Sequence, residues 1–234
     1  MAEHTHGHAG SAPALPPGTS GTKMIVTLGS IGLVCGVLIV GAFQVTLSAI
    51  TRNKATLLQE SILAVVPNAT HSRTFVEHDG VLSPDADAAA PGERYYAAYD
   101  AGGTLMGVAV EAQGQGFADA VKLIYGYSPQ RHAIVGFKVL ESHETPGLGT
   151  KIESDPGFRA NFDSLQVVPT ADFSGVEHSV ELAKHGKKEH PWQVEAITGA
   201  TISSRAVARM LKTSTDAAVP IIAKNLEVLK GGAQ

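Results

Sequence analysis

The stretch 121-VKLIYGYSPQRHAIVGFKVLES-142 decides the fold class, because it holds two short apolar segments separated by a turn sequence. Residues 121–128 and 133–142 are rich in Val, Ile and Tyr, and every second residue from Val135 to Val139 is apolar. This composition and this period of two predict β-strands, and Ser128-Pro-Gln-Arg between them predicts a turn. We therefore expect an antiparallel hairpin here.

The sequence on either side extends this hairpin into a larger α+β domain. Residues 94–100 and 104–112 have the same strand-like composition and lie one turn apart, so the four segments predict an antiparallel meander. Residues 202–230 have helical propensity, and Pro220 is expected to kink or split that helix. A twisted antiparallel sheet packed by helices is the fold class that this order predicts.

The N-terminal part predicts a membrane anchor. Residues 24–50 contain no charged side chain, and roughly 20 apolar helical residues already span a bilayer core. Gly32 and Gly36 have the GxxxG spacing that lets another helix approach closely. The expected organisation is a disordered tail (1–22), a transmembrane helix (23–50), a connector helix (51–70) and a domain (71–234).

Three polar regions are predicted to carry no chemistry. His4, His6 and His8 could bind a metal, but the surrounding composition is more typical of a flexible tail. Residues 79–92 are expected to form a loop, and 184–190 a solvated basic loop rather than a ligand site.

Composition excludes several function classes. The net charge of −4 gives no basic character for nucleic-acid binding. Cys35 is the only cysteine, so neither a disulfide framework nor a thiolate metal site is possible. The chain has no dinucleotide glycine fingerprint and no GxxxxGK[ST] phosphate loop, which disfavours a nicotinamide dehydrogenase or an ATPase.

The segment 197-ITGATISS-204 is the first candidate site. Thr201 lies where the last helix is expected to start, and free N–H groups and the helix dipole make such a position suitable for an anion. Gly199 and Ala200 leave the backbone open, and the other hydroxyls are potential donors: Thr198, Ser203 and Ser204. A plain helix cap at Thr201 explains the pattern equally well.

The segment 143-HETPGLGTKI-152 is the second candidate site. Pro146-Gly147 is typical of a type II turn, and Gly149 keeps the backbone free of bulk so that a flat ligand can lie against it. His143 and Glu144 are possible acid–base groups, but they have no spaced partners for a metal site. An ordinary strand-ending loop is the alternative.

Together the two segments resemble a known family. TGATISSRAV is similar to the [ST]GAT-x-[ST] motif of the FMN-binding subunits of the Rnf and Nqr respiratory complexes, and ESHETPGLGTKI is similar to that family's ring-side loop. The resemblance covers roughly residues 24–228 and is closer to the RnfG branch than to the NqrC branch. Thr150 departs from the pattern, which has a small or acidic residue there, and the His/Pro-rich tail is longer than the family's.

The resemblance implies a cofactor and its contacts. FMN would be bonded through its phosphate to Thr201 by a flavin transferase that uses FAD and Mg²⁺. Thr198, Gly199, Ala200 and Ser203 would hold the phosphate. Main-chain N–H groups of 145–149 would bond the ring. The resemblance also places further residues near the ring: Thr145, Gly147, Leu148 and Gly149, with His143, Glu144 and Lys151 as weaker ring-side or proton-handling candidates.

The resemblance also implies a role. The chain would relay electrons among other membrane subunits of a complex that pumps Na⁺ or H⁺, without a complete active site of its own. It would span the bacterial inner membrane once, with its domain on the periplasmic side, although Lys23 against Arg52 and Lys54 slightly favours the opposite orientation. The alternative is a membrane-anchored sensor or assembly module without covalent FMN.

Overall fold

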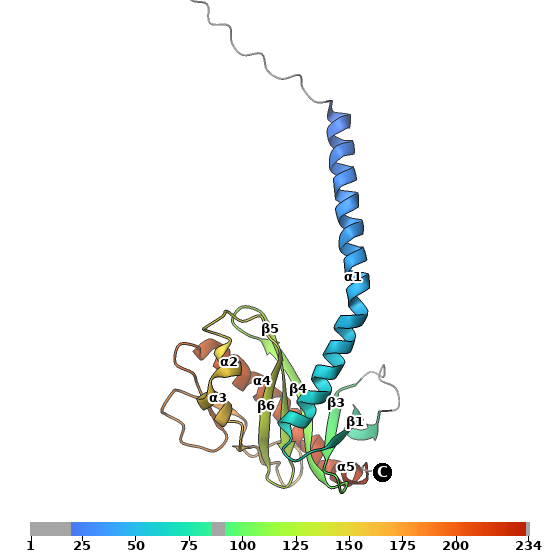
Figure 1. The fold of residues 1–234 in the computed structure, drawn as a ribbon. Coiled ribbons are helices and arrows are strands. Elements are labelled where there is room, and N and C mark those ends of the chain that lie inside the picture. The colour runs from blue at the N-terminus through green and yellow to red at the C-terminus, as the bar shows by residue number, and fades with distance from the viewer. Residues whose placement is uncertain (1–19, 86–91, 233–234) are drawn as a thin grey trace, which may run out of the picture. The chain divides into compact units, whose positions relative to one another are not determined.

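The computed structural model describes residues 20–85 and 92–232 (Figure 1). The predicted tail, with His4, His6 and His8, lies outside these residues. The chain divides into two compact units, residues 1–53 and 54–234. Helix α1 (Gly21–Val65) is long and apolar enough to cross a membrane, with a mean hydropathy of 2.4 over an 18-residue window in which no residue is buried. It ends at Val65, two residues before Pro67, so residues 66–70 of the expected connector helix are not helical.

The second unit is built on a seven-stranded antiparallel sheet with the strand order β2-β1-β3-β4-β5-β6-β7. The bounds are β1 His71–His78, β2 Val81–Pro84, β3 Arg94–Tyr99, β4 Leu105–Gln115, β5 Ala120–Ser128, β6 Ala133–Glu141 and β7 Leu165–Gln166. The four strands expected from the sequence are confirmed as β3 to β6, and the α+β class is confirmed.

One loop prediction is wrong in part. Residues 79–92 were expected to be a loop, but β2 lies within them and pairs with β1. The connection is short because Asp79 and Gly80 both have positive φ, 51° and 80°, which gives a tight hairpin turn. Residues 86–91 of the expected loop lie outside the described part of the chain.

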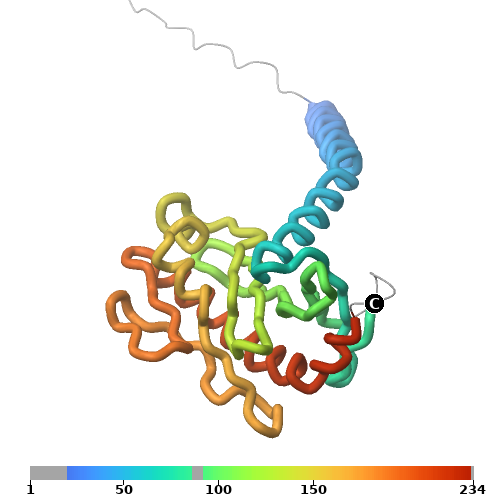
Figure 2. The backbone as a smooth tube through the Cα atoms, turned by 60° about the horizontal axis from the view of Figure 1, so that its bottom comes forward, coloured from blue at the N-terminus to red at the C-terminus, as the bar shows by residue number. Residues whose placement is uncertain are grey.

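Four helices follow β6 in the chain among the described residues. They are α2 Lys151–Ser154, α3 Pro156–Ala160, α4 Thr201–Lys224 and α5 Leu226–Gly231, and a small parallel pair, β8 Glu181–Ala183 and β9 Gln193–Glu195, precedes α4. Two of the helices, α2 and α3, precede the short strand β7. Figure 2 shows α4 as the orange-to-red helix that passes beside the strands.

Pro220 was expected to kink or split the last helix, and the helix is not split there. α4 continues through Pro220 to Lys224, and the break comes at Asn225. There the side-chain amide donates to the carbonyls of Ile221 and Gly80, and its oxygen accepts from Leu82 N–H. A buried side chain that bonds the β1–β2 hairpin therefore sets the end of α4, because these tertiary bonds replace the next helical ones.

The sheet has a hydrophobic core on each face. Alternation along β3 sends Tyr95, Ala97 and Tyr99 into the core under α4, and Tyr96 and Ala98 into a second core on the opposite face. The end of α1 supplies Ile62 and Val65 to the second core, and Val66 joins them directly after the helix. The connector part of α1 is thus an integral part of the domain.

Glycines allow the end of α1 to contact the sheet backbone directly. Gly126 of β5 and Gly136 of β6 are register partners. A Cβ on either residue would lie 2.7 Å from main-chain atoms of Val65. Side chains at these positions would hold the helix end away from the strands.

Candidate functional site

The segment 197–204 turns from β9 into α4, so Thr201 is the first residue of the helix, as predicted. Gly199 turns the backbone with φ of 83°, a conformation that glycine adopts without strain. The first helical hydrogen bond joins Ser204 N–H to the Ala200 carbonyl at 2.9 Å. In the described part of the chain, the N–H groups of residues 201–203 have no acceptor, which leaves three donors at the positive end of a 24-residue helix.

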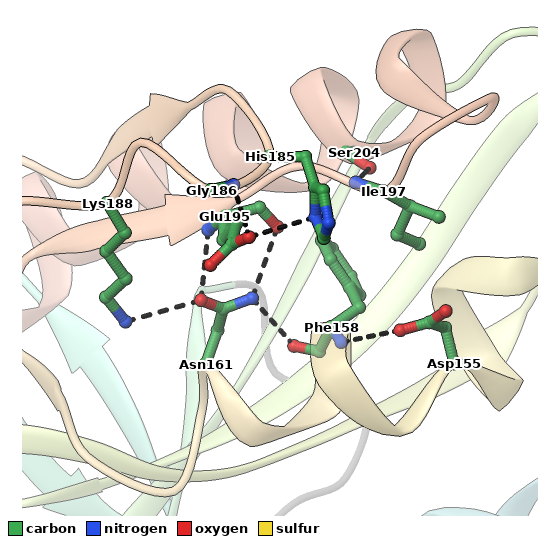
Figure 3. Close-up of polar contacts among 9 residues, drawn as sticks. All are labelled: Asp155, Phe158, Asn161, His185, Gly186, Lys188, Glu195, Ile197 and Ser204. Carbon is green, nitrogen blue, oxygen red and sulfur yellow. Dashed lines mark hydrogen bonds and ion pairs between the residues drawn. The ribbon is translucent and has the colours of Figure 1, made fainter.

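The hydroxyls of this segment fall into two pairs. Thr198 and Thr201 are exposed, whereas Ser203 and Ser204 are buried. Ser204 Oγ donates to the Ala200 carbonyl and accepts from Ile197 N–H at 3.1 Å, a contact drawn in Figure 3. The serines therefore form the inside of the turn, and the two threonines face outward.

Glu144 is the residue that joins this turn to the rest of the site. Its Oε1 accepts from the N–H groups of Phe117 at 2.7 Å and Ala118 at 3.0 Å, and its Oε2 accepts from the Ser203 hydroxyl. Burial by itself raises the pKa of Glu144, but the hydrogen bonds from Ser203 and the two amides outweigh it and hold the pKa below its ordinary value. The carboxylate is therefore ionised at neutral pH although it is buried inside the protein.

The loop after β6 is a closed turn. Gly147 has φ of 75°, as the turn prediction requires, and its N–H donates to the Thr150 hydroxyl at 3.0 Å. Leu148 N–H donates to the Thr145 carbonyl at 3.2 Å. Two of the N–H groups expected to bond a ring are thus used inside the loop, while those of Thr145 and Gly149 have no acceptor among the described residues.

Three large apolar side chains are exposed around Glu144. Phe117 is 59%, Leu148 52% and Ile202 52% exposed. Phe117 donates its N–H to the Glu144 carboxylate. Leu148 precedes Gly149, which lies close to the Glu144 side chain, and Ile202 precedes Ser203, whose hydroxyl bonds the carboxylate. Exposed apolar side chains gathered from separate segments are typical of a binding surface.

His143 and Lys151, the remaining predicted site residues, lie outside the contacts of the Glu144 carboxylate. His143 is exposed, with its Nδ1 3.9 Å from the Asp119 carboxylate. Lys151 is half-buried and lines a hollow of about 240 Å³ together with Thr198. The other residues of that lining are Asp155, Gly157, Phe158, His185, Glu195, Ala196 and Ile197.

Hydrogen bonds frame this hollow (Figure 3). The Asn161 amide nitrogen donates to the Phe158 and Glu195 carbonyls, and its oxygen accepts from Glu195 N–H at 2.9 Å. His185 Nδ1 lies 2.9 Å from Glu195 Oε1, which also accepts from Gly186 N–H at 2.7 Å. Residues 184–190 are all exposed, as predicted, but the fold brings His185 into the wall of the hollow.

Sequence reasoning missed several of these residues. Phe117 has a recognisable signal, since it is an apolar residue inside the glycine-containing loop 114-GQGFADA-120. Asn161 and His185 have none, because their partners are far away in the sequence. A larger hollow of about 570 Å³ lies between α4 and the strands and is lined by none of the predicted site residues.

Comparison with known proteins places this arrangement in a family. Residues 116–216 match the model of the FMN-binding domain. The G subunit of an ion-translocating oxidoreductase complex from Methanosarcina acetivorans is 32% identical over 196 residues, which are 83% of this chain and 93% of that protein. The chain belongs to the RnfG family.

Other members of the RnfG family agree with this assignment. The Haemophilus influenzae (strain 86-028NP) protein of the same name is 29% identical over 81% of this chain and 86% of its own length. The G subunit of a proton-translocating ferredoxin:NAD(+) oxidoreductase complex from Clostridium ljungdahlii is 27% identical over 74% of this chain and 92% of its own length. The resemblance stated from the two motifs is confirmed.

Solved structures share the fold. Shewanella oneidensis NqrC has a TM-score of 0.60 with 21% identity, over 77% of this chain and all of that one. The C subunit of a Na(+)-translocating NADH-quinone reductase from Parabacteroides distasonis has a TM-score of 0.58 with 21% identity, over 74% of this chain and 95% of that one. The single apolar helix and the family membership indicate a membrane-anchored protein.

Proposed function

We propose that this chain is the electron-transfer subunit of an Rnf-type ion-pumping complex and carries FMN through a phosphoester bond to Thr201. The observation that carries the proposal is an exposed Thr201 hydroxyl, at a helix start with three free N–H groups, inside an FMN-binding domain. When bound, FMN supplies the redox chemistry, and the chain supplies position and electrostatics.

Exposure and hydrogen bonding favour Thr201 over its neighbours as the attachment point. The hydroxyls of Ser203 and Ser204 are buried and bonded to Glu144 and Ala200, so they are closed to a transferase. Thr198 is exposed but precedes the turn at Gly199 and is not part of the helix. Only Thr201 combines an accessible hydroxyl with the first turn of α4.

The free N–H groups of 201–203 suit the phosphate that would follow attachment. Helix N-termini stabilise anions through unsatisfied donors and the aligned peptide dipoles. The backbone at Gly199 is open, because no atom lies within 4 Å of a Cβ built there. The phosphate contact that we propose at Ser203 is therefore made by its main-chain N–H, since the Ser203 hydroxyl is bonded to Glu144. The Ala200 N–H already donates to the Ile197 carbonyl at 3.1 Å, so the contact that we propose at Ala200 is one of close packing and not a hydrogen bond.

Attachment requires a group transfer that the chain does not catalyse alone. Thr201 Oγ1 would bond to the FMN phosphorus of FAD, the pyrophosphate bond would break, AMP would leave and the hydroxyl proton would pass to a base. None of the described residues makes a hydrogen bond or ion pair with the Thr201 side chain, so a flavin transferase with Mg²⁺ is the proposed source of that base.

The isoalloxazine ring is proposed to lie on the apolar side chains around the turn. Leu148, Phe117 and Ile202 offer exposed apolar surface, and the free N–H groups of Thr145 and Gly149 can bond ring acceptors. Lys151 and His143 remain candidates for the ring edge.

The proposed cellular setting follows the family plan. Residues 23–50 would span the bacterial inner membrane, with the domain on the periplasmic side, and other membrane subunits would deliver and accept electrons. Residues 24–50 of this span have no charged side chain, so they offer no ion path of their own. Protease treatment of sealed vesicles tests the orientation, and digestion of the domain only from the cytoplasmic side would contradict it.

A denaturing gel viewed under ultraviolet light tests the covalent bond. After coexpression with a flavin transferase, the native chain is expected to give a fluorescent band, and Thr201→Ala to remove it with folding intact. Thr198→Ala is the matched control, because it deletes the other exposed hydroxyl, and its band is expected to remain. The mass of the peptide containing 197–204 identifies the bonded residue. A native chain without a band would support the sensor or assembly role instead.

A further inference from the structure

Glu144 carries a buried carboxylate, with 4% of the residue's surface exposed. Burying a carboxylate is costly unless hydrogen bonds replace its water, and here three protein donors do so. The electron-carrying role proposed above does not itself require a charge at this place. The position of the carboxylate therefore needs its own explanation.

The carboxylate meets three segments of the chain. It bonds the amides of Phe117 and Ala118 in the β4–β5 loop and the Ser203 hydroxyl in the first turn of α4. Its own loop contributes Gly149, where a Cβ would lie 2.8 Å from the Glu144 Cβ. Each of these segments presents one of the exposed residues Phe117, Leu148 and Ile202.

The space around Glu144 is matched to this one side chain. A Cβ on Gly116 would collide with Oε1, and a Cβ on Gly149 would collide with Oε2. Neither glycine has a positive φ, so close contacts are the constraint at these positions. The Glu144 carboxylate supplies such a contact at both, and at Gly116 the Asp119 carbonyl and the Val121 side chain add others at 2.8 and 2.9 Å. The three segments are therefore packed on the carboxylate as well as bonded to it.

We propose that Glu144 is the positioning residue of the flavin site, fixing the 116–118 loop, the 145–149 loop and the first turn of α4 to one another before FMN attaches. Thr201 lies two residues before Ser203 in the same helical turn. The hydrogen bonds of Glu144, which we call the brace, therefore hold the Thr201 hydroxyl in one geometry for the transferase. This inference rests on the proposed attachment of FMN to Thr201. It adds that the acceptor is preorganised by a carboxylate that the flavin does not need to touch.

The rate of flavin attachment tests the role of Glu144. The full-length chain in detergent is mixed with a purified flavin transferase, FAD and Mg²⁺, and covalent flavin is followed by in-gel fluorescence. Glu144→Ala is expected to slow attachment roughly 10- to 100-fold, the loss expected when a reacting group is misplaced by about 1 Å. Trp192 fluorescence confirms that each variant is folded at the assay temperature.

A conservative variant separates positioning from general stability. Glu144→Gln keeps an oxygen that accepts from the two amides and a nitrogen that can bond Ser203, so its rate is expected to return to within about threefold of native. Glu141→Ala is the matched control, since this neighbouring carboxylate is exposed and pairs with Lys54, and it should react at the native rate. A folded Glu144→Ala chain that reacts at the native rate would overturn the inference, as would Glu144→Gln reacting as slowly as Glu144→Ala.

Two further outcomes are decisive. If Glu144→Ala does not fold, Ser203→Ala takes its place, because it removes a single bond of the brace. It is expected to slow attachment several-fold, and an unchanged rate would refute the inference. If the native chain gains no flavin, the proposed function fails and the inference fails with it. If the native chain is labelled at Thr201 and Glu144→Ala is labelled at the same rate, the inference fails while the proposed function stands.

Discussion

Replacing Gly126 with alanine should destabilise the domain, because no space exists for a methyl group beneath the end of α1. The new Cβ would lie 2.7 Å from the Val65 carbonyl carbon, whereas ordinary van der Waals contact begins at 3.4 Å. The colliding atoms belong to the main chain and cannot rotate away. The helix end must therefore retreat by at least 0.7 Å from strand β5.

The magnitude follows from overpacking. Forcing extra volume into a packed core costs about 1–3 kcal/mol, and a rigid main-chain neighbour puts this site in the upper part of that range. Replacing glycine also removes unfolded-state entropy, which offsets roughly 0.5 kcal/mol. We expect a net loss of about 2 kcal/mol, which corresponds to a melting temperature about 4–8 °C lower for a domain of this size.

The assay is thermal unfolding of the full-length chain in detergent, followed by the fluorescence of Trp192, the only tryptophan. Gly175→Ala is the matched control, since a Cβ there has no atom within 4 Å and its φ is not positive. Its melting temperature should stay near the native value. A Gly126→Ala melting temperature equal to that of the control would refute the close approach of α1 to the sheet.

Three further predictions concern the site and its surroundings. Because the folded-state pKa of Glu144 lies below its ordinary value, the stability that it confers should be complete above pH ~4.3, the unfolded carboxyl pKa, and lost as pH falls through the folded pKa. The unfolding midpoint of Glu144→Gln should vary less with pH in acid, and an unchanged dependence would speak against this. Gly199→Ala should cost about 1–2 kcal/mol in thermal unfolding, since φ of 83° strains a residue with a Cβ although space is free around it. The His178 and His190 rings stack on Trp192 with centroid distances of 3.9 and 4.5 Å, so the His178→Ala, His190→Ala double variant should leave the indole more exposed to water and shift Trp192 emission to longer wavelength, and an unchanged emission spectrum would speak against the stacking.

The strands, the anchor and the start of α4 were predictable because their signals are local. Alternating apolar residues in 121–142 define strands by their own periodicity, and the uncharged run 24–50 defines a helix that can span a bilayer. Gly147 adopts the positive φ that Pro146-Gly147 predicts. Asp79-Gly80 is a local hairpin signal for the pairing of Val81–Pro84 with β1, although residues 79–92 were expected to be a loop. The end of α4 at Asn225 was not predictable, because it depends on tertiary contacts with the β1–β2 hairpin that have no local signal.

For the site, the sequence by itself determined which residue types are present and where the helix begins, including Thr201 at its start. Only the tertiary structure decided how the side chains are used, because burial and hydrogen-bond partners depend on segments that meet in space. Ser203 has a donor hydroxyl in the sequence, but the fold directs it to Glu144. From the sequence Glu144 is a loop carboxylate, and in the structure it is a buried connection between three segments that the glycines at 116 and 149 allow to approach closely.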